Sequence, residues 1–312
     1  MSASPAEAPV DERLPIRVIG AAAQRALARG AAGRVIATFE RSFYVATEAG
    51  TLACFGAAAL GPGPLNVLIE AGRAHAMVIT RMVEGASVAV TETTVAVGPV
   101  HFSLAGATAW EPVRVANAAA TLARERTRLA LAAATLPHTG LAPLAKAAFL
   151  DRAALGSARS TDPLLEAAFK PFAALAGWLG DALALVLGQP LAPVPAVVAT
   201  LIGLGPGLTP SGDDLIGGTL VVLREVGRPD IADALAAFAL PLAERSTGAV
   251  SLAHLRAAAA GEAAAALHDF LAALARGSDE ALAAALTNVG GVGHSSGLDA
   301  LAGIACVLAR LP

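Results

Sequence analysis

One sequence template occurs twice in the second half of the chain, each time between a glycine-rich loop and an apolar run. Residues 211–218 read SGDDLIGG and residues 296–303 read SGLDALAG, so both follow the pattern S-G-x-D-x-[IL]-x-G. The segment GPGLTP, residues 205–210 (the first loop), precedes one copy, and GGVGHS, residues 290–295 (the second loop), precedes the other. Because proline lacks a backbone N–H and glycine weakens regular structure, each loop predicts a break that ends where a helix starts.

The runs that follow, 215–223 and 298–308, are apolar nearly all round, and a helix of that kind must be buried. Small residues one turn in would let the two helices approach closely; these are Gly217, Gly218 and Gly303. In the first copy, a serine at the helix start with an acid three residues later forms a capping-box pattern. We therefore expect two buried helices whose acids, Asp214 and Asp299, turn back onto their own helix starts or hold a cation that offsets their charge.

The composition changes near residue 115, from β-branched and aromatic runs to alanine- and leucine-rich ones. We expect an α+β fold with an antiparallel β-rich unit (a meander or partial barrel) at 14–115, followed by an all-α bundle at 116–312 whose centre is the two buried helices. Residues 1–13 read as a disordered leader and 16–28 as a helix. Strands are predicted at 34–39, 42–47, 51–55, 65–69, 75–80, 87–90, 93–97 and 100–104. Helices are predicted at 117–134, 144–155, 163–187, 194–204, 213–226, 231–243, 250–260, 262–275, 279–286 and 298–311.

Composition also narrows the classes of partner. Of the 312 residues, 55% are hydrophobic and 15% are charged, and the net charge is −3 without a basic block, which argues against nucleic acid and anionic membranes as partners. Proline and charge interrupt every long apolar stretch, and the first residues lack the apolar core of a signal peptide. The two cysteines are isolated in apolar surroundings. We expect a cytoplasmic protein that hides apolar surface in a homo-oligomer or a complex with other chains.

A buried helix start presents unpaired N–H groups and the positive end of the helix dipole, an arrangement that suits an anion. Two such starts behind similar loops predict one shared site, at which the loops lie against each other and bind small anionic substrates. Arg245 is added because it is predicted in a Ser/Thr/Gly loop and its planar fork fits carboxylate or phosphate, although a solvated arginine at a helix end explains it equally well. The predicted substrate- or anion-binding residues are Gly205, Gly207, Thr209, Ser211, Gly212, Asp213, Arg245, Thr247, Ser295, Ser296 and Gly297.

Three residues are candidates for catalysis. His294 lies inside the second loop, where it could carry a proton or donate a hydrogen bond to an anion, or could simply satisfy loop carbonyls. Asp214 and Asp299 are the acids that the two copies share. We predict no cofactor and no dedicated metal site, because the acids lack a tight ligand spacing, although a divalent cation between Asp214 and Asp299 remains an alternative. His254, one turn after Ser251, reads as a partly buried polar residue.

The same residues carry a family resemblance. The segments GLGPGLTPSGDDLIGG and VGHSSGLDALAG, with the Arg245–Thr247 loop and Ser251, resemble the AllH-type subunit of oxamate carbamoyltransferase, a family in which some members carry a carboxylase label. The resemblance is sharpest from Leu201 to Gly303 and faint in the β half, where GPGPLN at 61–66 matches best. It implies an enzyme of allantoin and purine degradation that converts oxamate and carbamoyl phosphate into oxalurate and phosphate beside other subunits. It assigns no catalytic residues.

Two further functions remain open from the residues. The chain could be a structural subunit, in which case the template marks only capped core helices. It could also be a metal-dependent, carboxylase-like enzyme that uses the paired aspartates. Carbamoyl transfer to oxamate involves a phosphate and a carboxylate, which agrees with two buried helix starts and fixed donors for a developing negative charge. We therefore favour the carbamoyltransferase subunit.

Overall fold

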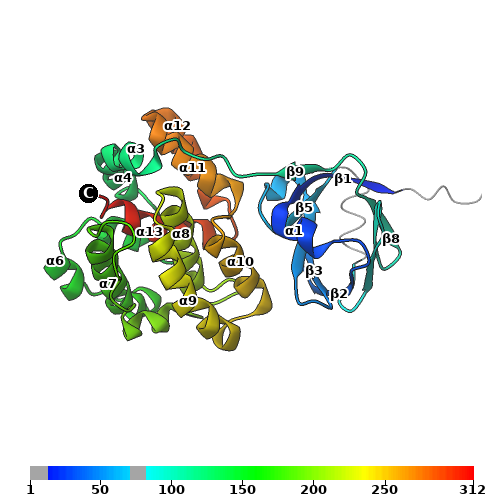
Figure 1. Cartoon of the computed structure of the whole chain (residues 1–312), viewed down its shortest axis with the longest axis horizontal. Helices are drawn as coiled ribbons and strands as arrows, with labels where there is room; N and C mark the ends of the chain where they lie inside the picture. The colour runs from blue at the N-terminus through cyan, green and yellow to red at the C-terminus, as the bar shows by residue number, and fades with distance from the viewer. Residues whose placement is uncertain (1–12, 71–81) are drawn as a thin grey trace, which may run out of the picture. The chain divides into compact units, whose positions relative to one another are not determined.

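The computed structural model describes residues 13–70 and 82–312, and the chain forms two compact units that divide between Glu111 and Pro112 (Figure 1). The first unit is built of strands and the second of helices, so the predicted α+β class is confirmed. The predicted leader, except for residue 13, and the strand predicted at 75–80 lie outside the described residues.

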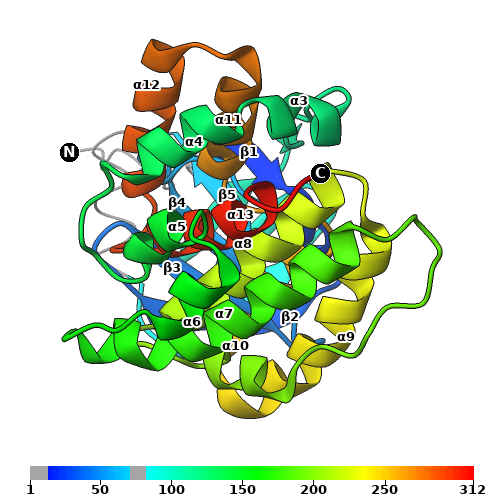
Figure 2. The ribbon, with the colours of Figure 1, turned by 90° about the vertical axis from the view of Figure 1, so that its left-hand side faces the viewer.

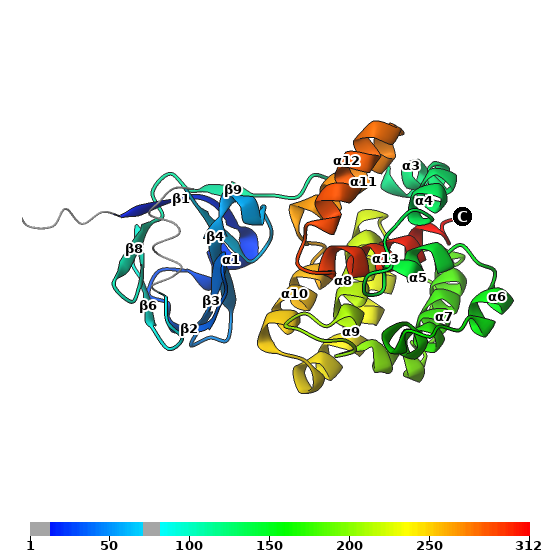
Figure 3. The same ribbon diagram turned by 180° about the vertical axis from the view of Figure 1, so that it is seen from behind.

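Eight strands of the first unit close into a ring. Their order is β5-β4-β3-β2-β6-β7-β8-β1, and β1 also pairs with β5 (Figure 3). A further strand, β9, pairs with the end of β1, next to the residues of β1 that pair with β8. The sheet is mainly antiparallel, but β4 pairs with β5 in parallel and β1 pairs with β8 and β9 in parallel. The strands are β1 Leu14–Gly20, β2 Ala32–Thr38, β3 Ser42–Thr47, β4 Leu52–Ala57, β5 Asn66–Ile69, β6 Ser87–Val90, β7 Thr94–Val97, β8 Val100–Ser103 and β9 Thr108–Trp110.

Three aromatic side chains form the centre of this barrel-like sheet. Phe43 stacks on Phe55 with ring centroids 5.1 Å apart, and Phe55 lies 5.0 Å from Phe102. All three are fully buried. They come from β3, β4 and β8, so strands far apart in the ring share one core through the large apolar area of their rings.

The helix predicted at 16–28 is wrong in its first half. That half is β1, and only Ala21–Ala26 forms a helix, α1. Ile16 and Ile19 are buried in the barrel core, and β-branched side chains of this kind favour a strand. The strand signal was obscured by the alanine-rich segment that follows directly. The three-residue strand β9 was also missed.

In the helical unit, α8 and α13 lie at the centre and the other helices surround them (Figure 2). Both central helices are buried over most of their length, as predicted. The helices are α3 Ala118–Arg124, α4 Arg126–Ala133, α5 Ala142–Ala147, α6 Arg152–Ser157, α7 Pro163–Leu183, α8 Ser211–Glu225, α9 Pro229–Ser246, α10 Ala249–Ala259, α11 Ala265–Arg276, α12 Asp279–Gly290 and α13 Ser296–Leu308; two short 3-10 turns are η1 Ala58–Leu60 and η2 Ala196–Leu201.

Several predicted helices are divided or shortened. The one predicted at 117–134 breaks at Glu125 into α3 and α4. The one predicted at 144–155 also divides, because Asp151 caps a new helix by accepting from the N–H of Ala154 at 2.7 Å. The segment predicted at 194–204 forms only the 3-10 turn η2, and α9 continues through Pro241 as far as Ser246.

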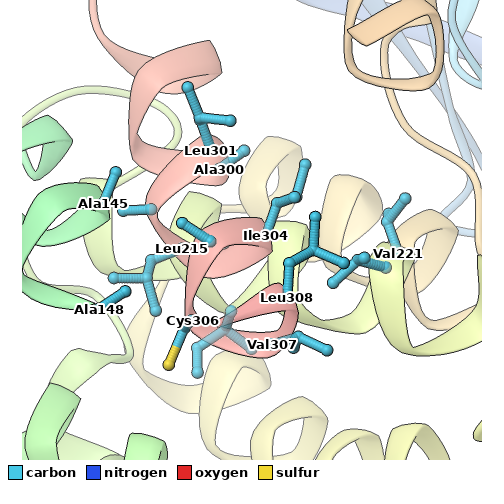
Figure 4. Close-up of a cluster of buried hydrophobic side chains, with 14 of the residues drawn as sticks. Ala145, Ala148, Leu215, Val221, Ala300, Leu301, Ile304, Cys306, Val307 and Leu308 are labelled. Carbon is cyan, nitrogen blue, oxygen red and sulfur yellow. The ribbon is translucent and has the colours of Figure 1, made fainter. Parts of the chain in front are cut away.

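The crossing of α8 and α13 depends on two glycines. A Cβ atom on Gly218 would overlap the carbonyl oxygen of Ala300, and one on Gly303 would overlap that of Leu215. The backbones therefore touch, and the apolar side chains around the crossing close the core (Figure 4). Gly217 does not take part as predicted, because it faces α10, where a Cβ would lie 3.7 Å from that of Ala258.

Both cysteines, Cys54 and Cys306, are buried and free, and burial raises the pKa of each thiol to about 11. They therefore act as small apolar core residues.

Within the described ranges, no helix is both long enough and apolar enough to cross a membrane.

Candidate functional site

The starts of α8 and α13 lie against each other, as the repeated template predicts. The hydroxyl oxygens of Thr209 and Ser296 are 2.9 Å apart and share a hydrogen bond. Both hydroxyls also lie close to the carboxyl group of Asp214 and favour its charged form. In the opposite direction, the hydroxyl of Ser211 on α8 hydrogen-bonds Asp299 on α13. Polar side chains at the start of each helix thus contact polar side chains at the start of the other.

Asp213 connects three segments near the start of α8. Its Oδ1 accepts from the N–H of Gly203 at 2.8 Å, and its Oδ2 accepts from the hydroxyls of Thr247 at 2.6 Å and Ser251 at 2.7 Å. The side chain is almost fully buried. Three donors around a buried carboxylate stabilise its charged form. Asp213 therefore fastens the segment ahead of the first loop and the start of α10 to α8.

Asp299 plays a comparable part at the start of α13. Its Oδ1 accepts from the N–H of Leu141 at 2.5 Å, and its Oδ2 accepts from the hydroxyl of Ser295 at 2.9 Å. The residue is fully buried. Burial raises its pKa, while the donors from Leu141, Ser211 and Ser295 oppose that rise. Asp299 thus connects α13 to the segment that leads into α5.

Asp214 differs from both of these acids. Its Oδ2 is buried and has no hydrogen-bond partner within the part of the chain that the structure describes. Burial raises the pKa of this carboxyl well above its usual range, and the nearby charges of Asp299 and Asp213 raise it further, against the hydrogen bonds from Ser296 and Thr209. Burial and the neighbouring negative charges both favour the protonated form of this carboxyl group. Of the three acids in this cluster, Asp214 is the one with an oxygen that is still free to form a hydrogen bond.

The predicted capping pattern is not formed. α8 begins at Ser211 itself, preceded by Pro210, and neither helix has a side-chain cap. The first N–H groups bond loop carbonyls instead. That of Gly212 donates to Leu204 at 2.9 Å, and that of Gly297 donates to Val292 at 3.1 Å. Because the loops fold back far enough to present these carbonyls, the acids are released from capping and reach across to other segments.

Residues 201–308 match the family model of oxamate carbamoyltransferase subunit AllH. The family recognised from the motifs is therefore confirmed over this segment. The AllH match contains both loops, both central helices and all three acids of the cluster. The description is that of a subunit, which implies further subunits in the same enzyme. Comparisons with the curated proteins and with the solved structures gave no significant match.

The other predicted residues of the AllH segment differ in their exposure. His294 is exposed and makes no hydrogen bond or ion pair to the described residues. Arg245 is also exposed, in the last turn of α9 and not in a loop as predicted. Gly205 and Gly207 lie in the first loop with φ of 112° and 95°, values that glycine adopts readily. His254 lies on α10, and burial lowers its pKa to about 4.

Sequence reasoning did not find two of the groups that hold the cluster, the N–H of Gly203 and the N–H of Leu141. Both are backbone donors, and any residue except proline supplies one. Leu141 is also far in sequence from Asp299. A further group, the hydroxyl of Ser251, was named for the family resemblance and for its place one turn before His254, but its spacing from Asp213 gave no sign of the hydrogen bond.

A search of the described residues for metal ligands finds no group of three or more His, Cys, Asp and Glu side chains arranged to hold an ion. A cavity of about 510 Å³ lies at the other end of α13, lined by residues such as Phe149, Gly180 and Arg310. None of the predicted site residues lines it. The arrangement at the loops supplies hydroxyl and carboxyl groups as hydrogen-bonding partners.

Proposed function

We propose that this chain is a subunit of an oxamate carbamoyltransferase and that its helical unit binds the substrate at the starts of α8 and α13. One observation carries the proposal. The segment that matches the AllH family contains a half-buried aspartate, Asp214, whose buried Oδ2 has no hydrogen-bond partner among the described residues. In native proteins buried polar atoms are nearly always paired, so an unpaired one within a small polar cluster indicates a ligand.

The proposal divides the work among the acids. Asp213 and Asp299 have hydrogen bonds to both oxygens, so they hold the neighbouring segments against the starts of α8 and α13. Asp214 is left to contact the substrate. The first loop supplies donors for phosphate or carboxylate oxygens, since no hydrogen bond to the described residues engages the N–H groups of Gly205 and Gly207. Such fixed donors would also stabilise the negative charge that develops when the oxamate nitrogen attacks the carbamoyl carbon.

His294 is the proposed proton carrier of the reaction. It is exposed on the second loop, so it keeps access to solvent protons. The attacking amide nitrogen must lose a proton as the new C–N bond forms, and a histidine is suited to accept one near neutral pH.

The test is carbamoyl transfer by the purified chain together with the other subunits of the enzyme. We expect oxalurate and phosphate to form, and we expect Asp214→Ala to reduce turnover by about 100-fold or more. His294→Ala should reduce turnover with the fold intact. The matched control is Asp269→Ala, which removes an exposed aspartate on α11 and should leave turnover unchanged. Equal turnover of Asp214→Ala and the control would contradict the proposed site.

A structural subunit is the second candidate, and the bonding of Asp213 and Asp299 favours it, because these acids serve the fold. The two functions separate in an assembly experiment. Light scattering on wild type and Asp214→Ala, alone and with the other subunits, measures both the homo-oligomer that we expect and the complex. Loss of activity with assembly unchanged supports the enzyme. Loss of assembly with each mutation that reduces activity supports the structural role.

A further inference from the structure

We propose that Asp214 is a neutral carboxyl group that recognises the planar amide end, –CO–NH2, of a small substrate, and that it does not bind a carboxylate or a metal ion. This inference rests on the proposed function, which supplies two ligands with such an end, oxamate and a carbamoyl group. It goes further in assigning which end of the ligand enters the cluster. The argument uses the unpaired oxygen, the surrounding charges and the hydroxyl groups.

The unpaired oxygen defines what the ligand must offer. Asp214 Oδ2 is buried without a partner, while the hydroxyls of Thr209 and Ser296 act on the same carboxyl group. A protonated carboxyl has one O–H donor and remaining acceptor capacity. A ligand that completes this group must therefore accept one hydrogen bond, and an amide carbonyl oxygen does so.

The surrounding charges select against anions. Asp299 from α13 and Asp213 from the same helix are the charged groups that act on Asp214, and both are negative. Their own oxygens are held by three donors each, from Gly203, Thr247 and Ser251 for Asp213, and from Leu141, Ser211 and Ser295 for Asp299. Because the oxygens of Asp213 and Asp299 already have donors, Asp214 is the acid of the three that we expect to carry the proton. A carboxylate ligand placed at Oδ2 would add a third negative charge to a buried cluster.

The helix starts do not offset this repulsion as the sequence alone suggested. The N–H groups of Gly212 and Gly297, which point from the first turns of α8 and α13, donate to the loop carbonyls of Leu204 and Val292. They are not available to an anion beside Asp214. The anionic end of the ligand is therefore directed away from the cluster, toward the first loop.

The hydroxyl groups complete the recognition of an amide. Thr209 Oγ1 and Ser296 Oγ are 2.9 Å apart, and each keeps lone pairs that accept an N–H. An amide presents a carbonyl acceptor and N–H donors in one plane, so its oxygen meets the O–H of Asp214 while its nitrogen donates to a hydroxyl. The exposed residues Leu208 and His294 mark the tips of the two loops, from which the ligand enters.

Oxamate and oxalate form a matched pair of probes, because they have the same shape and differ only in carrying an amide or a second carboxylate. Calorimetric titration of the full chain, assembled with its partner subunits, should show oxamate binding at least about tenfold more tightly than oxalate, since tenfold corresponds to about 1.4 kcal/mol, which lies within the cost of leaving a buried polar group unpaired. Equal affinities, tighter binding of oxalate, or binding of neither would overturn the inference.

Substitution at Asp214 separates a neutral carboxyl from a charged one. Asp214→Asn keeps a donor and an acceptor, so we expect oxamate affinity within about threefold of wild type, whereas Asp214→Ala should weaken it about tenfold. Asp269→Asn is the surface control. If Asp214→Asn weakens binding as much as Asp214→Ala does, Asp214 acts as a charged carboxylate and the inference is wrong. An infrared band of a protonated carboxyl that disappears in Asp214→Asn is the second readout.

Turnover measured on the same samples separates this inference from the proposed function. A preference for oxamate over oxalate without carbamoyl transfer would leave the recognition of the amide standing and remove the proposed reaction. Carbamoyl transfer that survives in Asp214→Ala with unchanged oxamate affinity would leave the reaction standing and remove the role of Asp214.

Discussion

The starts of α8 and α13 share a sequence template but differ in their chemistry. At α13, the acid of the template, Asp299, has donors on both oxygens and holds the segment leading into α5. At α8, the equivalent acid, Asp214, has an unpartnered oxygen, and the neighbouring Asp213 performs the holding instead. The second copy has Leu298 where the first has Asp213. One added carboxylate in the first copy thus takes over the holding role of the template acid, which means that equal motifs do not indicate equal roles.

The largest expected effect concerns the crossing that brings the two starts together. Gly218→Ala places a Cβ against the carbonyl oxygen of Ala300, so we expect a loss of about 3 kcal/mol or more in the free energy of unfolding. Gly217→Ala is the matched control, because its Cβ meets only an ordinary contact, and should be neutral or gain up to about 1 kcal/mol from helix propensity. Denaturant unfolding measures both. Equal losses would show that the backbones do not touch.

The next effect compares the two adjacent acids. Asp213→Ala leaves the N–H of Gly203 and the hydroxyls of Thr247 and Ser251 without their charged acceptor, so we expect a loss of about 3 kcal/mol. Asp214→Asn should change stability by less than about 1 kcal/mol, because a neutral side chain of the same shape replaces a neutral one. Thermal unfolding of both variants at neutral pH measures the two losses of stability. A larger loss in Asp214→Asn than in Asp213→Ala would contradict the assigned roles of the two acids.

The pH dependence of stability sharpens the difference. Because the pKa of Asp214 is raised by folding, the folded state holds a proton that the unfolded state releases above about pH 4. This stabilisation is complete below the unfolded pKa and is lost as the pH rises through the folded pKa. Asp214→Asn should therefore flatten the fall in stability toward alkaline pH. A slope identical to that of wild type would contradict the protonated state.

The smallest effect tests the contact between the copies themselves. Thr209→Val and Ser296→Ala each remove one hydroxyl of the shared hydrogen bond, and we expect each to lose about 1 kcal/mol. The double variant should lose less than the sum, with a coupling energy of about 0.5 kcal/mol or more, since both substitutions break the same bond. Strict additivity would show that the two loops are energetically independent.

Much of the fold could be predicted because apolar patterning determines it. The burial of α8 and α13 followed from their apolar surfaces, and strands such as Ser42–Thr47 and Ser87–Val90 were predicted with their observed bounds. The sequence did not show that β1 is a strand or that Glu125 divides a helix, because alanine-rich neighbours support a helix on either side. Local propensity was overridden there by burial in the barrel and by packing between helices.

The sequence predicted which segments meet at the candidate site, but not the role of each residue there. The repeated template placed Thr209 and Ser296 together, but it could not distinguish Asp213, Asp214 and Asp299, since their roles depend on donors from other segments. The N–H groups of Leu141 and Gly203 are backbone atoms without a sequence signature. The loop carbonyls of Leu204 and Val292, which satisfy the helix starts, are equally invisible in the sequence.

The way in which β1 closes the barrel has a consequence for folding on the ribosome. Leu14 pairs with Phe102 and Val18 pairs with Thr108, so the first strand of the barrel needs partners made 80 to 90 residues later: 102 − 14 = 88 and 108 − 18 = 90. Until those residues emerge, β1 can pair with β5 on one edge only, and its other edge stays unpaired. Pairings of such long range form slowly. The barrel can therefore close only after residue 108 has been made, and slow translation before that point would prolong the exposure of an open strand edge to aggregation.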